Sequence, residues 1–343
     1  MISQKDYIRL SEKRLDKYSK LEYETYKLIE KKNQEFINEI NKDIENLFKS
    51  LDKDEITKKE AHHIFKSRVT KSQLNEVRTR IYSTDNKTLR KQLIHRHNDL
   101  LKKEQITQLE LLKEKLYINS RLILDYQTQK LTNCFTEILK DSYNYNIYLN
   151  SLRSGYAFQY TELNDRIINL LMRERFHGKN FNARLKNHTL KFYDTTTYIL
   201  TKGFANGFSI QRMAEDFQKR SDVKNYEALR LMRTESTRYY NLGEQYSREE
   251  CGIDKYMIVA TLDHKTSNEC QKQDGQIYKT SEFEEGVTAP PFHWNCRSTT
   301  ISVIDKNSIK FNERIAKDKN GQNIKVDGSM KYSDYKKIYL KGA

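Results

Sequence analysis

The side chains with the greatest capacity for chemistry lie close together near the C-terminal end of the chain. Cys270, His293 and Cys296 offer two thiols and an imidazole, a ligand set that suits Zn²⁺. A fourth ligand could come from His264 or Asp263. The sequence therefore makes zinc a candidate cofactor, with Cys270, His293, Cys296 and His264 as its candidate ligands.

Two adjacent prolines open the segment that holds two of these ligands. Pro290 and Pro291 are the only prolines in the 343 residues. Proline fixes its own φ angle and favours an extended conformation in the residue before it, so His293 and Cys296 are expected on a stiff loop. We expect that loop to bring both side chains to Cys270. Sulfur atoms more than about 10 Å apart would exclude a shared metal, since Zn–S bonds measure about 2.3 Å.

A structural interpretation of these residues needs no metal. Buried cysteines and a hydrogen-bonded histidine can stabilise a small module whose own hydrophobic core is thin. Arg297 would then pair with Asp263 or Glu235, and such a buried pair costs stability when one partner is lost. The sequence favours this interpretation over both zinc binding and catalysis.

The catalytic alternative is a cysteine hydrolase or a metal-dependent nuclease. A thiol beside an imidazole can act as a nucleophile, and the Asp263-His264 pair loosely resembles the start of a His-Asn-His nuclease site. The sequence offers neither an evident oxyanion loop nor the last histidine of that pattern. Such an enzyme would centre on His264, Cys270, His293 and Cys296.

Short apolar and β-branched runs predict strands around these side chains. Residues 256–262 form a continuous apolar run typical of a buried strand. Residues 276–278 follow an Asp-Gly turn, and residues 297–304 alternate hydroxyl with branched apolar side chains. We therefore predict a small α+β module at 251–305.

A helix predicted at 223–248 precedes the module and carries Arg233, Glu235 and Arg238. Charged residues grouped on a helix usually face solvent, and we expect that here. In the alternative arrangement, they pair with one another or dock on the strands.

The first half of the chain indicates long helices, because neither glycine nor proline occurs before Gly155. Ile37, Ile40 and Ile44 recur at helical spacing, Thr57-Lys-Lys-Glu predicts a capping box, and the leucines between 89 and 122 continue the helical pattern. The predicted fold is thus mostly α. Its parts are a bundle or coiled-coil arm at 1–150, a helical middle region at 151–250, the α+β module at 251–305 and a basic tail at 306–343.

The chain is basic, with 62 Lys and Arg against 47 Asp and Glu and a net charge of +15. A positive excess spread along a chain favours a polyanion bound without sequence preference, such as double-stranded DNA. The candidate DNA-binding residues in the tail are Lys306, Lys310, Arg314, Lys317, Lys319, Lys336 and Lys337.

Four cysteines are too few and too scattered for a disulfide framework in a chain of this length. No stretch approaches 18 apolar residues, so we expect no membrane span. These features predict a protein made in a reducing cytoplasm.

The order of motifs resembles the Mu F-like head morphogenesis family, the minor head proteins of tailed bacteriophages. The resemblance covers about residues 205–304 and departs at Ser298, where many members carry a second cysteine. It rests on Leu-Met-Arg-Thr-Glu-Ser-Thr-Arg at 231–238, a strand that ends at Asp263, and the proline-opened segment at 290–297. The motif residues are Arg233, Glu235, Asp263, Thr266, Cys270, Pro290, Pro291, His293, Cys296 and Arg297.

The resemblance implies a virion component assembled in the host cytoplasm and placed inside the head near the portal. Portal, capsid or scaffold proteins are the implied partners, together with double-stranded DNA bound without sequence preference. The implied role is head morphogenesis and genome delivery, with no catalytic activity in the module itself.

Overall fold

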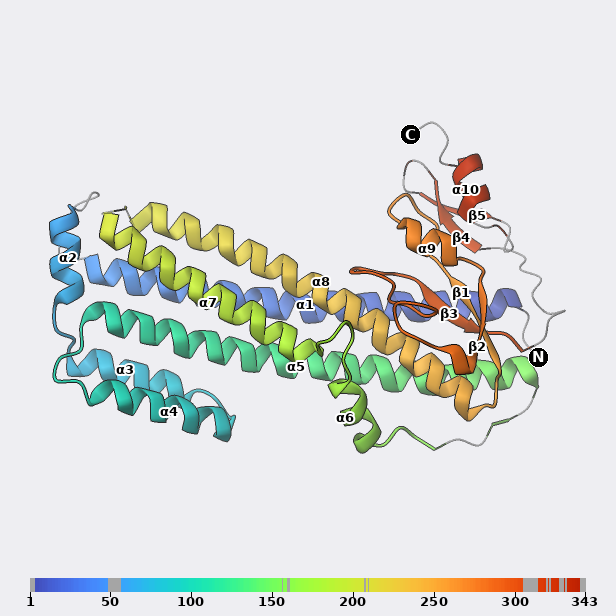
Figure 1. Cartoon of the computed structure of the whole chain (residues 1–343), viewed down its shortest axis with the longest axis horizontal. Helices are drawn as coiled ribbons and strands as arrows, with labels where there is room; N and C mark the ends of the chain where they lie inside the picture. The colour runs from blue at the N-terminus through green and yellow to red at the C-terminus, as the bar shows by residue number, and fades with distance from the viewer. Residues whose placement is uncertain are drawn as a thin grey trace. The chain divides into compact units, whose positions relative to one another are not determined.

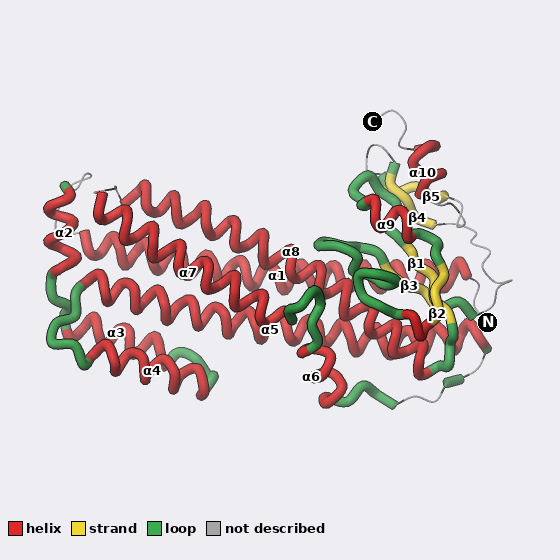
Figure 2. Tube along the Cα trace, viewed as in Figure 1, coloured by secondary structure: helices red, strands yellow, loops and turns green. Residues whose placement is uncertain are grey.

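Helices dominate the computed structural model, and a small antiparallel sheet follows them near the C-terminus (Figures 1 and 2). This confirms the expected mostly α fold with a C-terminal α+β module. The structure describes residues 4–48, 57–155, 157–158, 161–206, 208, 210–304, 314–318, 320, 322–326, 330 and 332–339. Its helices are α1 (Gln4–Phe48), α2 (Lys58–Lys66), α3 (Lys71–Tyr82), α4 (Lys87–Leu101), α5 (Gln108–Ser154), α6 (Asp165–Arg173), α7 (Phe181–Asn206), α8 (Ile210–Glu250), α9 (Asn268–Gln273) and α10 (Tyr332–Tyr339).

The chain divides into two compact units, each assembled from segments that are distant in sequence. Unit 1 comprises residues 1–25, 131–181 and 230–343, and unit 2 comprises residues 26–130 and 182–229. The long helices α1, α5 and α8 contribute residues to both units. The linear boundaries expected at 150, 250 and 305 stay a prediction.

The core of unit 2 follows the isoleucine stripe found in the sequence. Ile37, Ile40 and Ile44 are buried and pack in one cluster with Phe192 of α7 and Phe217 of α8. The predicted stripe is therefore a seam between helices. The predicted capping box also forms: the Thr57 side chain accepts a hydrogen bond from the Glu60 backbone, and the Glu60 carboxylate accepts one from the Thr57 backbone.

Two helix boundaries differ from those expected. The leucines between 89 and 122 lie in two helices, because Thr107 and Glu110 exchange hydrogen bonds of 2.9 and 3.3 Å that cap a new first turn at the start of α5. Conversely, α8 begins at Ile210 rather than near 223, and neither glycine nor proline interrupts the added turns.

The sheet of unit 1 has the order β2-β1-β3, with both pairings antiparallel. Its strands are β1 (Lys255–Val259), β2 (Ile277–Lys279) and β3 (Thr299–Ser302). β1 is shorter than predicted, because the Ala260 N–H donates to the Asp274 carboxylate at 2.9 Å instead of to a neighbouring strand. Met257 and Ile301 are paired across β1 and β3 and are buried with Tyr7 of α1 and Leu149 of α5.

The segment 306–343, expected as a basic tail, contains a hairpin and a helix. β4 (Arg314–Lys317) pairs with β5 (Asn323–Val326), and α10 follows. Tyr332 and Tyr335 of α10 are buried with Leu262, which lies just beyond β1. The described part of this segment is thus packed on the module. No helix in the described ranges combines the length and apolarity needed to cross a membrane.

Candidate metal centre

The loop that carries His293 and Cys296 is fastened to α8 by two threonines. The Asn295 N–H donates to the Thr234 hydroxyl at 3.0 Å, and the Thr237 hydroxyl donates to the Cys296 carbonyl at 2.7 Å. Asn295 has a φ of 61°, in the left-handed region that asparagine tolerates better than most residues. Both prolines before the loop are buried. Two backbone groups of the loop are therefore fixed to α8, and the prolines that precede the loop are packed in the interior.

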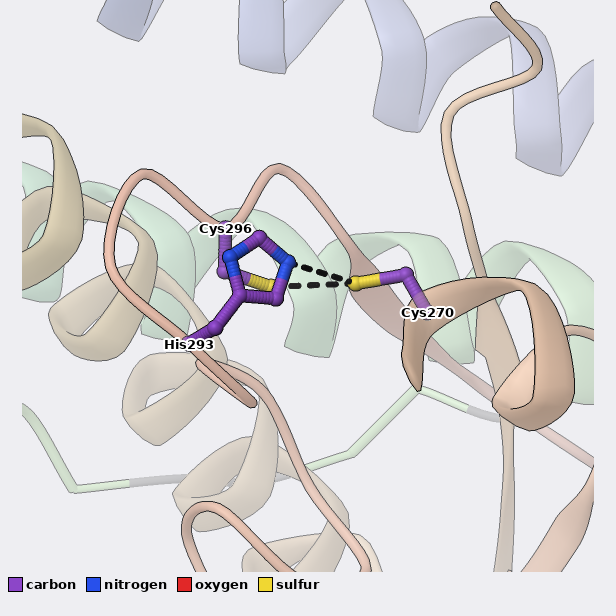
Figure 3. Close-up of side chains that lie close together, drawn as sticks. All are labelled: Cys270, His293 and Cys296. Atoms are coloured by element: carbon purple, nitrogen blue, oxygen red, sulfur yellow. Dashed lines mark hydrogen bonds between the residues drawn. The ribbon is translucent and has the colours of Figure 1, made fainter. Parts of the chain in front are cut away.

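Cys270, His293 and Cys296 come together as predicted (Figure 3). The Cys270 Sγ lies 3.1 Å from His293 Nε2 and 3.6 Å from Cys296 Sγ. Cys270 is in the first turn of α9, where the Ser267 hydroxyl accepts a hydrogen bond from its backbone N–H. The predicted separation of less than about 10 Å between the sulfurs is confirmed.

The protonation of the His293 ring follows from its contacts. Its Nδ1 lies 2.8 Å from the Trp294 carbonyl, which can only accept, so Nδ1 carries the hydrogen. In the neutral imidazole, Nε2 then presents a lone pair towards Cys270. The His293 side chain is half-buried, whereas both cysteines are buried.

The contact between the two sulfurs shifts the pKa values of the two thiols in opposite directions. The hydrogen bond with Cys296 and burial raise the pKa of Cys270, whereas the hydrogen bond with Cys270 lowers the pKa of Cys296 to about 6. Either sulfur could donate in this contact. A nucleophilic thiolate must be reachable by substrate, and the burial of both sulfurs argues against the hydrolase alternative.

His264 does not join this group. It is exposed, and the described ligand atoms that lie within 4.8 Å of one another are those of Cys270, His293 and Cys296 alone. The expectation of His264 as a fourth ligand therefore has no support in the geometry. Asp263 does not join the group either, because its carboxylate forms an ion pair with Arg297.

Arg297 pairs with Asp263, one of its two expected partners. Its Nη1 and Nη2 lie 2.5 and 2.7 Å from the two carboxylate oxygens, a bidentate arrangement. Asp263 also accepts hydrogen bonds from the Thr266 hydroxyl at 3.1 Å and the Lys265 N–H at 3.0 Å. Burial alone would raise the pKa of Asp263, but the hydrogen bonds from Arg297 and Thr266 outweigh it and lower that pKa.

The charged group on α8 is only partly solvated. Arg233 is exposed as expected, whereas Glu235 and Arg238 are buried, so the expected solvated face is wrong for these two. The Arg238 guanidinium lies 2.8 Å from Glu285 and 3.3 Å from Glu174. Its function is to hold the segment after β2 and the segment after α6 against α8.

A row of buried polar side chains on α8, which was not predicted from the sequence, binds β3. The Asn241 side chain accepts a hydrogen bond from the Thr300 N–H at 3.0 Å, and Glu244 accepts one from the Thr300 hydroxyl at 2.5 Å. The Arg248 Nη1 donates to the same hydroxyl at 3.0 Å. With the two loop-anchoring threonines, these residues recur at 3-4-3-4 spacing: Thr234, Thr237, Asn241, Glu244 and Arg248. That spacing was the available signal for one shared helix face.

The candidate DNA-binding residues are only partly described. Lys336 and Lys337 are exposed on α10. Arg314 and Lys317 lie in β4, where their side chains are not described, and Lys306, Lys310 and Lys319 fall outside the described residues. DNA binding by this set stays a prediction.

The comparisons with known proteins agree with the motif order. Residues 195–301 match the family model of Phage Mu protein F like proteins, which confirms the resemblance over that segment. The matched segment contains all ten motif residues between Arg233 and Arg297. It points to a role in phage head morphogenesis, with capsid-related partners and a place in or on the phage head assembled in the host cytoplasm.

Part of the chain is also similar to a curated protein whose function is uncharacterised. An uncharacterised protein of Haemophilus influenzae is 24% identical over 151 residues, which are 44% of this chain and 34% of the relative. The match thus spans about a third of that relative's length. No solved structure matches the chain.

Proposed function

We propose that this protein is a minor head component of a tailed phage, bound near the portal, that contacts packaged DNA and assists genome delivery. The observation that carries the proposal is the match of residues 195–301 to the Mu F-like family, a segment that contains all of α8 together with β1 and β2. Exposed apolar side chains on the long helices, such as Leu28 of α1 and Val223 of α8, are available for docking on portal, capsid or scaffold proteins.

The charge of the chain supports DNA as a second partner. A net charge of +15 attracts a polyanion over distances set by salt screening. Lys336 and Lys337 project from α10 and are free to meet phosphates, which carry no sequence information. The contact would therefore be electrostatic and independent of DNA sequence.

We predict salt-sensitive binding to duplex DNA without sequence preference. Each phosphate contact contributes about −0.9 to the slope of log K against log salt, so six contacts reduce affinity on the order of 10³-fold between 50 and 200 mM salt. Fluorescence anisotropy with labelled duplexes of unrelated sequence measures both properties. A flat salt response, or strong preference for one duplex, would contradict the prediction.

Charge-neutral variants test the contribution of α10 without cutting the chain. Deleting residues 306–343 would also remove Tyr332 and Tyr335 from the core around Leu262, so we choose Lys336→Gln with Lys337→Gln. The expected reduction of the slope is about 1.8. Lys87→Gln with Lys91→Gln, at exposed positions of α4, is the matched control of equal charge. If both double variants give the same slope of log K against log salt, α10 does not contact the DNA.

Deletion of the gene from the phage tests the delivery role. We expect that heads still assemble and package DNA but that the resulting particles infect poorly, because the protein is proposed to act when the genome leaves the head. DNA-filled particles are counted by electron microscopy and compared with plaques from the same preparation. Unchanged infectivity per filled particle would refute the delivery role, and a complete lack of heads would replace it with an essential assembly step.

A further inference from the structure

We propose that Cys270, His293 and Cys296 bind one zinc ion, which joins α9 to the loop after Pro291. The proposal concerns the stability of the module and does not depend on the proposed function. Two ligands come from a single short loop and the third from a separate helix. A bound metal would therefore be a cross-link between segments that the sheet itself does not connect.

The distances fit a tetrahedral zinc site. Zn–S bonds of about 2.3 Å and Zn–N bonds of about 2.0–2.1 Å place ligand atoms roughly 3.5–3.8 Å from one another. The Cys270 sulfur lies 3.6 Å from the Cys296 sulfur and 3.1 Å from His293 Nε2. A shift of a few tenths of an ångström at His293 would reach that geometry, and its half-buried side chain leaves room for the shift.

The surroundings of the ligands favour a metal. His293 donates its Nδ1–H to a backbone carbonyl, the contact that commonly orients a metal-bound histidine and leaves Nε2 as the ligand atom. Two thiols and an imidazole are soft and borderline ligands, which select zinc over magnesium or calcium.

Ser298 marks the fourth position of the site. Its hydroxyl is buried and makes no well-formed hydrogen bond among the described residues. It lies within weak hydrogen-bonding reach of the sulfurs of both Cys270 and Cys296. A buried hydroxyl without a well-formed hydrogen bond is costly in a protein interior. A metal-bound water or hydroxide beside Ser298 would satisfy it and complete four-coordination.

Cobalt titration of the full-length chain tests the proposal, with Co²⁺ as a visible probe of a tetrahedral thiolate site. The protein is purified under reducing conditions and stripped with a chelator. We expect one Co²⁺ per chain, thiolate charge-transfer absorption, and intense visible bands that added Zn²⁺ abolishes. Elemental analysis before stripping should find about one zinc per chain. Absence of the absorption in folded protein, or a Cys270–Cys296 disulfide under reducing conditions, would overturn the proposal.

Variants assign the ligands. Cys270→Ser and Cys296→Ser should each abolish the thiolate absorption at one equivalent of Co²⁺, whereas Cys134→Ser and Cys251→Ser, at buried cysteines outside the group, should retain it. If the first two variants fail to fold, the wild-type titration alone still decides whether a site exists. Retained absorption in Cys270→Ser or Cys296→Ser would also overturn the assignment.

The variant Ser298→Cys should bind zinc more tightly than the wild type. A third thiolate at the fourth position should slow zinc loss to a chelator by at least tenfold and strengthen the charge-transfer absorption of the cobalt form. Ser298→Ala should leave the stoichiometry at one. Unchanged exchange in Ser298→Cys would place the fourth ligand elsewhere and contradict the geometry argued above.

Discussion

Arg248→Met should lower the free energy of unfolding of unit 1 by about 3–5 kcal/mol, because it strands a buried carboxylate. Arg248 is buried, donates to Thr300, and lies 3.7 Å from Glu244. Burial raises the pKa of Glu244, and the nearby Arg248 opposes that rise. Without the guanidinium, Glu244 must either stay charged in the interior or take up a proton, and either result costs stability.

Fluorescence of Trp294, the single tryptophan of the chain, reports the unfolding of this unit in urea. Arg166→Met is the control, since it removes an exposed arginine of α6 in the same unit and should change stability by no more than about 0.5 kcal/mol. The double variant Glu244→Gln with Arg248→Met should lose less than the sum of the two single variants, because the charges are removed together. Additive losses would show that Arg248 and Glu244 are not coupled.

The group of candidate metal ligands could be predicted from the sequence better than the buried residues on α8 that hold the loop and β3 in place. Cysteine, histidine and proline are rare in this chain, so their grouping predicted the contact among Cys270, His293 and Cys296 without any knowledge of the fold. The Asp263–Arg297 pair was one of two alternatives, because an arginine that was expected to be buried beside the module needs an acidic partner. Both predictions rest on residue chemistry, which does not change with tertiary context.

The row of buried polar side chains on α8 could not be found in this way. Its threonines, asparagine and charged residues are also typical of a solvated helix face, and only the docking of β3 makes them buried. This buried row satisfies backbone and hydroxyl groups that an apolar face would leave unpaired. The long helices of the first half were predicted correctly because their apolar stripe and lack of glycine or proline are local properties.

A second large effect is expected in unit 2, where Lys224→Met should stabilise the protein at neutral pH. Lys224 is buried on α8, and its ammonium has no hydrogen-bond partner among the described residues. It lies 4.6 Å from the centre of the Phe192 ring, a contact that offsets part of the cost of burial. Burial lowers the pKa of Lys224 to about 7.

The sign of the pH dependence follows from that shift. Between pH 7 and about 10.5 the unfolded chain binds more protons at this lysine than the folded chain does, so stability rises with pH across the window. At about 1.36 kcal/mol per pKa unit, the ammonium costs the folded state roughly 4 kcal/mol at neutral pH. Methionine has a similar length, carries no charge, and removes that cost.

Urea unfolding of the wild type and Lys224→Met at pH 7 and pH 9.5, followed by circular dichroism, measures the effect. The variant should be more stable by several kcal/mol at pH 7. Its advantage should shrink at pH 9.5, because keeping the buried lysine neutral costs less as the pH approaches the pKa of about 10.5 in the unfolded chain. Lys219→Met, at an exposed position of the same helix, should leave stability and its pH dependence nearly unchanged. If Lys224→Met keeps the wild-type difference between the two pH values, the buried ammonium is not its source. A loss of stability at pH 7 would mean that the contact with Phe192 outweighs the cost of burial.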